Sequence, residues 1–143
     1  MTSPLIVLRG NSGSGKSSVA RALRERYGYG LAWVEQDYLR RVLLRERDIP
    51  DGKNIGLIET NVRYCLGAGY VTVLEGILHA KHYAPMLSHL HTDFGGQWYY
   101  FDLPFEETVR RHATRPQATE FGSEQTLTRT VDTILQKLHS TPA

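Results

Sequence analysis

Apolar and polar positions along the chain form two alternating kinds of block. Short, continuous apolar runs predict buried strands at 5–8, 31–34, 70–74 and 98–101. Between them, apolar residues recur at helical spacing and predict helices at 17–27, 38–46, 55–66, 79–90, 105–112 and 127–138. Strands that alternate with helices form parallel sheets covered on both faces. We therefore expect an α/β fold with three layers, α/β/α, around a mostly parallel sheet of about four strands.

The composition places the chain among ordinary globular proteins. Its 143 residues are 41% hydrophobic and 22% charged, which excludes a disordered chain and favours one domain over residues 1–143. A net charge of +2 gives no reason to expect a general nucleic-acid or membrane-surface binder. No apolar run approaches the roughly 20 residues of a membrane-spanning helix, and no secretory signal is visible. The single cysteine, Cys65, excludes an internal disulfide, and we expect the cytoplasm as the location.

One segment carries a specific nucleotide-binding pattern. Residues 10–17 fit G-x-x-x-x-G-K-[ST] without a mismatch, after a predicted strand and at the start of a predicted helix. Glycines let backbone N–H groups converge on phosphate oxygens, so we expect Lys16 at the β and γ phosphates of ATP and Ser17 at Mg²⁺. The alternative is a Gly/Ser-rich turn in which Ser17 caps the helix. The residues expected to bind the nucleotide are Asn11, Ser12, Gly13, Ser14, Gly15, Lys16, Ser17 and Ser18.

Further stretches place this phosphate loop in a class of proteins. They are residues 73–78, 99–108, 109–112 and 120–122. Together with the loop, they resemble the small-molecule kinases of the P-loop superfamily, and most of all a group of bacterial kinase-like or AAA-family ATP-binding proteins. Chloramphenicol phosphotransferases, zeta-type toxins, adenylylsulfate kinases and polynucleotide kinases belong to the same broad class. The resemblance implies a strand order of 2-3-1-4 and phosphoryl transfer from ATP to an acceptor.

An acidic residue follows the second predicted strand, where ligands of parallel sheets bind. Asp37 and Arg40 have the spacing D-x-x-R, which is similar to the acceptor-site motif of adenylylsulfate and polynucleotide kinases. Asp37 is expected to accept the proton of an attacking hydroxyl or to orient it, and Arg40 to hold an anionic acceptor. The alternative is that Asp37 caps a helix beginning at Tyr38. Arg41 points to another side of that helix, so at most one of the two arginines faces the site.

Glu75 ends the third predicted strand. In P-loop proteins an acidic residue here lies near Mg²⁺ or its waters, although Asp is commoner than Glu. We expect Glu75 to share the metal with Ser17 and to lie at the substrate. The alternative is a carboxylate that holds Lys16 or a nearby loop in place.

Arginines after the fourth predicted strand resemble those of a kinase lid. Arg110, Arg111 and Arg115 lie there, and we expect a lid over residues 110–125 in which Arg111 and Arg115 neutralise the transferring phosphoryl group. The alternative is a solvated basic helix paired with acidic neighbours. No apolar run in 116–125 can form the fifth strand usual in this class, so we expect that strand to be absent.

Two histidines follow the third predicted strand at a spacing of three. No carboxylate accompanies His79 and His82 at ligand spacing, and structural zinc sites usually include cysteine. The sequence therefore favours a contact between His79 and the acceptor over a metal site.

The sequence as a whole predicts an ATP- and Mg²⁺-dependent kinase acting on a hydroxyl of a small molecule. The alternative is a P-loop ATPase or nucleotide-dependent switch that acts through a partner. A polynucleotide kinase is a third hypothesis, which the small net charge disfavours.

Overall fold

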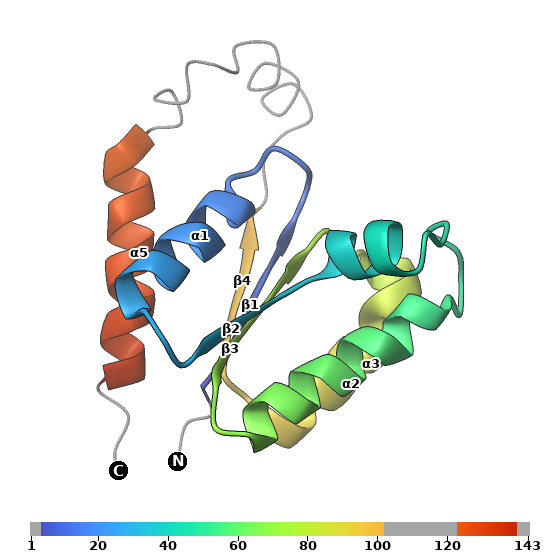
Figure 1. Cartoon of the computed structure of the whole chain (residues 1–143). Coiled ribbons are helices and arrows are strands. Elements are labelled where there is room, and N and C mark those ends of the chain that lie inside the picture. The colour runs from blue at the N-terminus through green and yellow to red at the C-terminus, as the bar shows by residue number, and fades with distance from the viewer. Residues whose placement is uncertain (1–3, 102–122, 140–143) are drawn as a thin grey trace.

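A parallel sheet lies between two layers of helices in the computed structural model, which describes residues 4–101 and 123–139 (Figure 1). The strands are β1 (Leu5–Gly10), β2 (Leu31–Glu35), β3 (Val71–Gly76) and β4 (Gln97–Phe101). The helices are α1 (Lys16–Tyr27), the π-helix η1 (Tyr38–Leu43), α2 (Lys53–Gly67), α3 (Ala80–Phe94) and α5 (Ser123–His139). The α/β fold class expected from the sequence is confirmed.

The strands run in the order β2-β3-β1-β4, and every pair is parallel. This is the order that the resemblance implied. Because the strands are parallel, all their carboxyl ends lie at one edge of the sheet, and the loop from β1 to α1 lies at that edge (Figure 1). The register places Glu75 of β3 between Leu8 of β1 and Glu35 of β2. The predicted helix at 105–112 and the expected absence of a fifth strand concern a segment outside the described residues.

The alternation of side chains along the strands divides the core in two. Leu5 and Val7 pack on one face of the sheet, with α2 and α3. Ile6 and Leu8 pack on the other face, with α1 and α5. Figure 1 shows these pairs of helices on opposite sides of the sheet. A strand that is buried on both faces reads as a continuous apolar run, which is why β1 was visible in the sequence.

The segment after β2 differs from the prediction of a helix at 38–46. It forms a π-helix over Tyr38–Leu43, in which Leu44 N donates to Leu39 O, five residues back. Glu46 N then donates to Arg40 O, and the Arg40 guanidinium donates in return to Glu46 O at 2.8 Å. This pair of bonds closes a turn wider than that of an α-helix. Apolar periodicity could not predict it, because none of the residues of η1 is buried.

Among the described residues, no helix is long and apolar enough to cross a membrane.

Candidate active site

The loop between β1 and α1 has the conformation of a phosphate cradle. Gly13 and Gly15 have φ angles of 79° and 100°, in the left-handed region that glycine adopts without strain. Ser14 N donates to Asn11 O at 3.2 Å and closes the loop. No side chain caps α1, whose N-cap residue is Gly15. The alternative in which Ser17 is a helix cap is therefore wrong, and no described side chain takes up the N-terminal N–H groups of α1, which can bind an anion.

Lys16 is held over this loop. Its side chain is buried, and its Nζ donates to Asn11 O at 3.0 Å. Burial lowers the pKa of the Lys16 ammonium, against the opposing effect of the Glu75 and Asp37 charges. A buried ammonium with a backbone carbonyl as its partner gains more from a bound phosphate than a solvated lysine does.

Glu75 lies beneath the start of α1 and is only 4% exposed. Ser17 Oγ donates to Glu75 Oε2 at 3.1 Å, and Trp33 Nε1 donates to Glu75 Oε1 at 3.2 Å. Burial and the neighbouring Glu35 raise the pKa of the Glu75 carboxyl, while the two hydrogen bonds and Lys16 lower it, and the balance is a raised pKa. No ion pair within 4 Å joins Glu75 to Lys16, so the carboxylate acts on the lysine only through its charge.

These groups fit a nucleotide with a hard divalent cation. The Ser14 hydroxyl is buried in this loop and has no hydrogen-bond partner among the described residues. The Ser17 hydroxyl and the Glu75 carboxylate offer the oxygen ligands that Mg²⁺ prefers. Ser18 follows them in the first turn of α1 and is half-buried.

Asp37 lies at the carboxyl end of β2, as the sequence predicts, but it does not cap η1. Its carboxylate is 61% exposed and lies 3.9 Å from Arg40 Nη2 and 3.6 Å from Arg41 Nη1. The capping alternative is therefore wrong. Arg40 is the less exposed of the two arginines and is fixed by Glu46 O, while Arg41 extends into solvent. Asp37 also acts electrostatically on Lys16, which places its charge near the phosphate loop.

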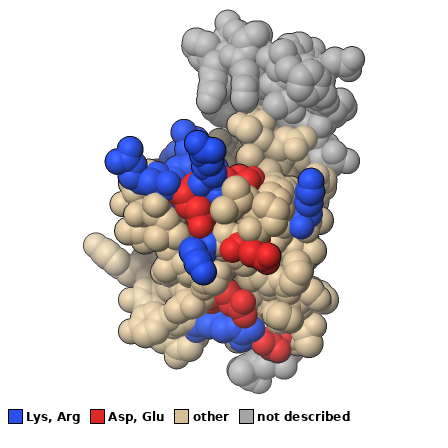
Figure 2. Space-filling model, turned by 90° about the vertical axis from the view of Figure 1, so that its right-hand side faces the viewer, with Lys and Arg blue, Asp and Glu red and all other residues tan. Residues whose placement is uncertain are grey.

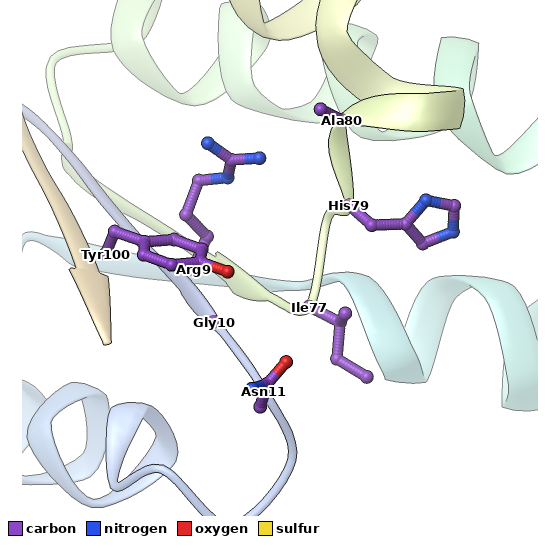
Figure 3. A pocket seen from close by; sticks show the side chains of 7 residues that line it. All are labelled: Arg9, Gly10, Asn11, Ile77, His79, Ala80 and Tyr100. Atoms are coloured by element: carbon purple, nitrogen blue, oxygen red, sulfur yellow. The ribbon is translucent and has the colours of Figure 1, made fainter. Parts of the chain in front are cut away.

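A pocket of about 300 Å³ opens beside the phosphate loop. Its lining comes from the ends of β1 and β4 and from the segment after β3, and includes Arg9, Asn11, Ile77, His79 and Tyr100 (Figure 3). Of the residues expected at the acceptor, His79 lines this pocket. Asp37, Arg40 and Glu75 do not line it.

Arg9 is the charged group of this pocket that sequence reasoning missed. Its Nη2 donates to Leu78 O at 3.0 Å, and its guanidinium lies 5.4 Å from the centre of the Tyr100 ring. Its Nε is buried without a hydrogen-bond partner, and among the described residues no carboxylate forms an ion pair with it. The signal in the sequence was a charged residue directly before Gly10, at the end of an otherwise apolar strand.

The other expected site residues lie outside the described part of the chain. They are Arg110, Arg111 and Arg115, together with the expected lid at 110–125, of which only the start of α5 is described.

The fold and the phosphate loop together define a P-loop protein with the strand order of kinases. The family model described as an AAA domain matches residues 5–140, and the chain belongs to this family. No curated protein sequence matches the chain at a significant level.

Several solved structures share the fold. The APS kinase CysC of Mycobacterium tuberculosis, solved with AMPPNP and APS, is 22% identical with a TM-score of 0.60 over 82% of this chain and 73% of that chain. The shikimate kinase of Acinetobacter baumannii, solved with shikimate, is 24% identical with a TM-score of 0.52, over 95% of this chain and 80% of that chain. A chain of the Pnkp1/Rnl/Hen1 complex is 26% identical with a TM-score of 0.59, over 75% of this chain and 38% of that chain. At these levels of identity the likeness shows a shared fold.

Proposed function

We propose that the protein is an ATP-dependent kinase that transfers the γ-phosphoryl group of ATP to a hydroxyl group of a small molecule. The observation that carries the proposal is the phosphate loop, with Lys16 and the Ser17–Glu75 pair, next to an open pocket. A hydrolase needs the phosphate loop and a water molecule. A kinase also needs space for an acceptor beside the γ-phosphate, and the pocket at Asn11 is the space that we assign to it.

The phosphate loop has the groups needed to hold ATP. Lys16 would exchange its bond to Asn11 O for the β and γ phosphates and neutralise charge on the transferring group. Ser17 and Glu75 would hold Mg²⁺, directly or through water. When bound, the ion neutralises charge on the phosphate oxygens. Arg111 and Arg115 are the residues we assign to closing over the transfer.

Asp37 does not line the pocket. We propose that the acceptor extends from the pocket past the phosphate loop and places its hydroxyl at Asp37, after the end of β2. The hydroxyl oxygen forms a bond to the γ phosphorus while the bond between that phosphorus and the β–γ bridging oxygen breaks, which leaves ADP. The hydroxyl proton passes to the Asp37 carboxylate and then to solvent, to which this side chain is open. Arg40 lies 3.9 Å from that carboxylate and is fixed by Glu46 O, so it can position Asp37 as well as bind an anion.

The pocket also indicates which acceptors to expect. Arg9 presents a buried N–H and a positive charge, and among the described residues the N–H has no hydrogen-bond partner and the charge has no carboxylate partner. Figure 3 shows the His79 ring directed away from Arg9, which leaves Arg9 as the charged group that faces the pocket. A guanidinium of this kind binds phosphate or carboxylate groups. We therefore propose an acceptor that carries an anionic group in addition to its hydroxyl.

The test is ADP production by the purified chain with ATP and Mg²⁺, with and without pools of hydroxyl metabolites sorted by charge. The proposal predicts that pools of anionic hydroxyl compounds raise ADP production above the acceptor-free rate. ADP production that is equal with and without every pool would instead identify an ATPase or a switch that acts through a partner.

A polynucleotide acceptor is the second candidate, because one structural neighbour comes from an RNA repair complex. Figure 2 looks onto the right-hand side of Figure 1, where Lys and Arg side chains lie next to Asp and Glu side chains and uncharged residues make up most of the surface. A nucleic-acid strand is better held by a continuous basic surface. The assay therefore includes a 5′-hydroxyl oligonucleotide, and labelling of its end would favour this second candidate.

A further inference from the structure

Two histidines and an aspartate from separate parts of the chain meet beside the first turn of α3. His79 is the N-cap residue of α3, His82 lies in its first turn, and Asp48 comes from the loop between η1 and α2. His79 Nε2 lies 2.9 Å from Asp48 Oδ2, and His82 Nδ1 lies 3.1 Å from Asp48 Oδ1. The sequence has no carboxylate at ligand spacing from these histidines, but the fold brings Asp48 to both imidazoles.

The three side chains offer the donor set of a metal site. One ligand atom from each lies within 4.8 Å of the others. Four ligands around Zn²⁺, at roughly 2.0–2.2 Å from the ion, lie about 3.3–3.6 Å from one another. Rotation of the three side chains can bring their ligand atoms from their present separations, all within 4.8 Å, to the separations of a zinc site. Imidazole nitrogens with a carboxylate oxygen favour transition metals such as Zn²⁺ over Mg²⁺.

The ion pairs and the exposure of the cluster also allow a cation, which binds against the positive charge of Arg40 that acts on Asp48. Among the described residues, the ion-pair partners of Asp48 within 4 Å are the two histidines. With neutral imidazoles the cluster carries one negative charge. His82 is only 10% exposed, whereas Asp48 and His79 are about one-third exposed, so an ion can enter from solvent and reach an inner ligand.

Tyr83 contacts two of the three side chains and limits how they can turn. The buried Tyr83 ring meets the His79 ring edge-on, with centroids 5.5 Å apart. The Tyr83 hydroxyl lies 3.4 Å from Asp48 Oδ1 and is itself fixed by Gln36 and Asn54. In metal sites, residues that contact the ligands without touching the ion hold those ligands in place and tune the affinity for the metal.

We propose that Asp48, His79 and His82 bind a divalent transition-metal ion, Zn²⁺ in preference to others, with a fourth position open to water or a further ligand. The ion replaces the two hydrogen bonds to Asp48, so the bound His79 Nε2 and His82 Nδ1 carry no proton and the opposite ring nitrogen of each carries it. Bound there, the metal fastens the loop before α2 to the start of α3. Figure 3 shows the His79 ring directed away from Arg9, so the metal lies on the far side of His79 from the pocket centre.

The experiment uses the tag-free full chain after treatment with a chelator. Zn²⁺ is titrated in competition with a chromophoric chelator, and Co²⁺ is added to read visible absorption. We expect one Zn²⁺ per chain and an absorption band for a Co²⁺ site with nitrogen ligands. We also expect Zn²⁺ to raise the melting temperature of the wild type, because it binds the folded state.

Variants of the three side chains test whether they are the Zn²⁺ ligands. The double variant His79→Ala/His82→Ala should weaken Zn²⁺ binding by more than the roughly 10- to 100-fold that loss of an outer partner costs. Asp48→Asn should weaken it too. The matched control is His89→Ala, because His89 is exposed on the same helix and lies outside the cluster. Ser17→Ala must retain the site, which separates it from the phosphate loop.

Two results would overturn the proposal. One is wild-type protein that takes up no stoichiometric Zn²⁺ and gives no Co²⁺ band. The other is a double histidine variant that binds Zn²⁺ as the wild type does while its circular dichroism shows a folded chain. If that variant does not fold, the wild-type Co²⁺ band and the Asp48→Asn titration decide the question. In either overturning case, Asp48 serves only as a hydrogen-bond acceptor that anchors the loop.

Discussion

The Ser17 hydroxyl donates to the Glu75 carboxylate at 3.1 Å and so joins the first turn of α1 to the end of β3. The two residues are 58 positions apart in the chain. The contact exists because β1 and β3 are adjacent parallel strands whose carboxyl ends lie at the same edge. It places the two groups that we assign to Mg²⁺ within one hydrogen bond of each other.

The first prediction concerns Glu75→Gln and the pH dependence of stability without nucleotide or Mg²⁺. Burial raises the pKa of the folded Glu75 carboxyl above its ordinary value of 4.5. Between 4.5 and that raised pKa the folded state binds more protons than the unfolded state, so stability falls as pH rises, by at most about 1.4 kcal/mol per pH unit. Above the pKa of Glu75 in the folded state, this carboxyl no longer makes stability depend on pH.

Glu75→Gln should remove this dependence, because an amide does not titrate. Urea unfolding of both proteins over the acidic range gives the comparison. The wild type should lose stability relative to the variant as pH rises from 4.5 and then run parallel to it. Curves that are parallel throughout would contradict the raised pKa.

The second prediction concerns Lys16→Ala. Removing a fixed cation from the transferring phosphoryl group should cost about 3–4 kcal/mol in the transition state, or roughly 10²- to 10³-fold in rate. ATP binding should weaken less than turnover. Steady-state ADP production and nucleotide titration measure the two effects, and a variant that retains full turnover would show that this loop is not the active phosphate site.

The third prediction concerns Asp37→Asn, which removes the charge that takes the proton while keeping the shape. Transfer should fall by about 10²- to 10⁴-fold, the range for loss of a general base. Because Asp37 is exposed and caps no helix, the melting temperature should stay the same. Nucleotide affinity should also hold, since the phosphate loop is intact.

Two outcomes separate Asp37 from the other acidic residue. Unchanged acceptor-dependent ADP production in Asp37→Asn would refute the base role and transfer it to Glu75. A loss of ATP binding would mean instead that Asp37 belongs to the metal shell.

The fourth prediction concerns the buried hydroxyl of Tyr83. It accepts a hydrogen bond from Gln36 Nε2 at 3.0 Å and donates to Asn54 Oδ1 at 3.1 Å. Tyr83→Phe leaves both amides without this partner, which should lower the free energy of unfolding by about 1–3 kcal/mol. Tyr64→Phe is the matched control, because Tyr64 is 74% exposed, and it should change stability by less than about 0.5 kcal/mol. Equal urea midpoints for the two variants would contradict the role of this network.

Local patterns in the sequence predicted the sheet and the phosphate loop. The run Leu5–Leu8 is apolar because β1 is buried on both faces, and the loop motif carries its conformation in its glycines. Asp37 and Glu75 could be placed because Asp37 lies two residues after β2 and Glu75 lies near the end of β3. In all these cases the signal lies within a few residues of the feature that it predicts.

Features that depend on distant contacts could not be predicted. Trp33 lies in a predicted strand, and only the β2–β3 pairing shows that its indole N–H reaches Glu75. Asp48 lies 31 positions before His79, in a loop whose course no periodicity describes. Sequence reasoning missed Arg9, because its pocket forms only when β4 brings Tyr100 beside it.

The most direct test of the kinase assignment follows the label from γ-labelled ATP in the presence of an anionic hydroxyl acceptor found by the metabolite pools. We predict one labelled acceptor molecule for each ADP formed, with transfer reduced roughly 10²- to 10³-fold in Lys16→Ala. Label that appears only as inorganic phosphate, at a rate independent of every acceptor, would contradict the account.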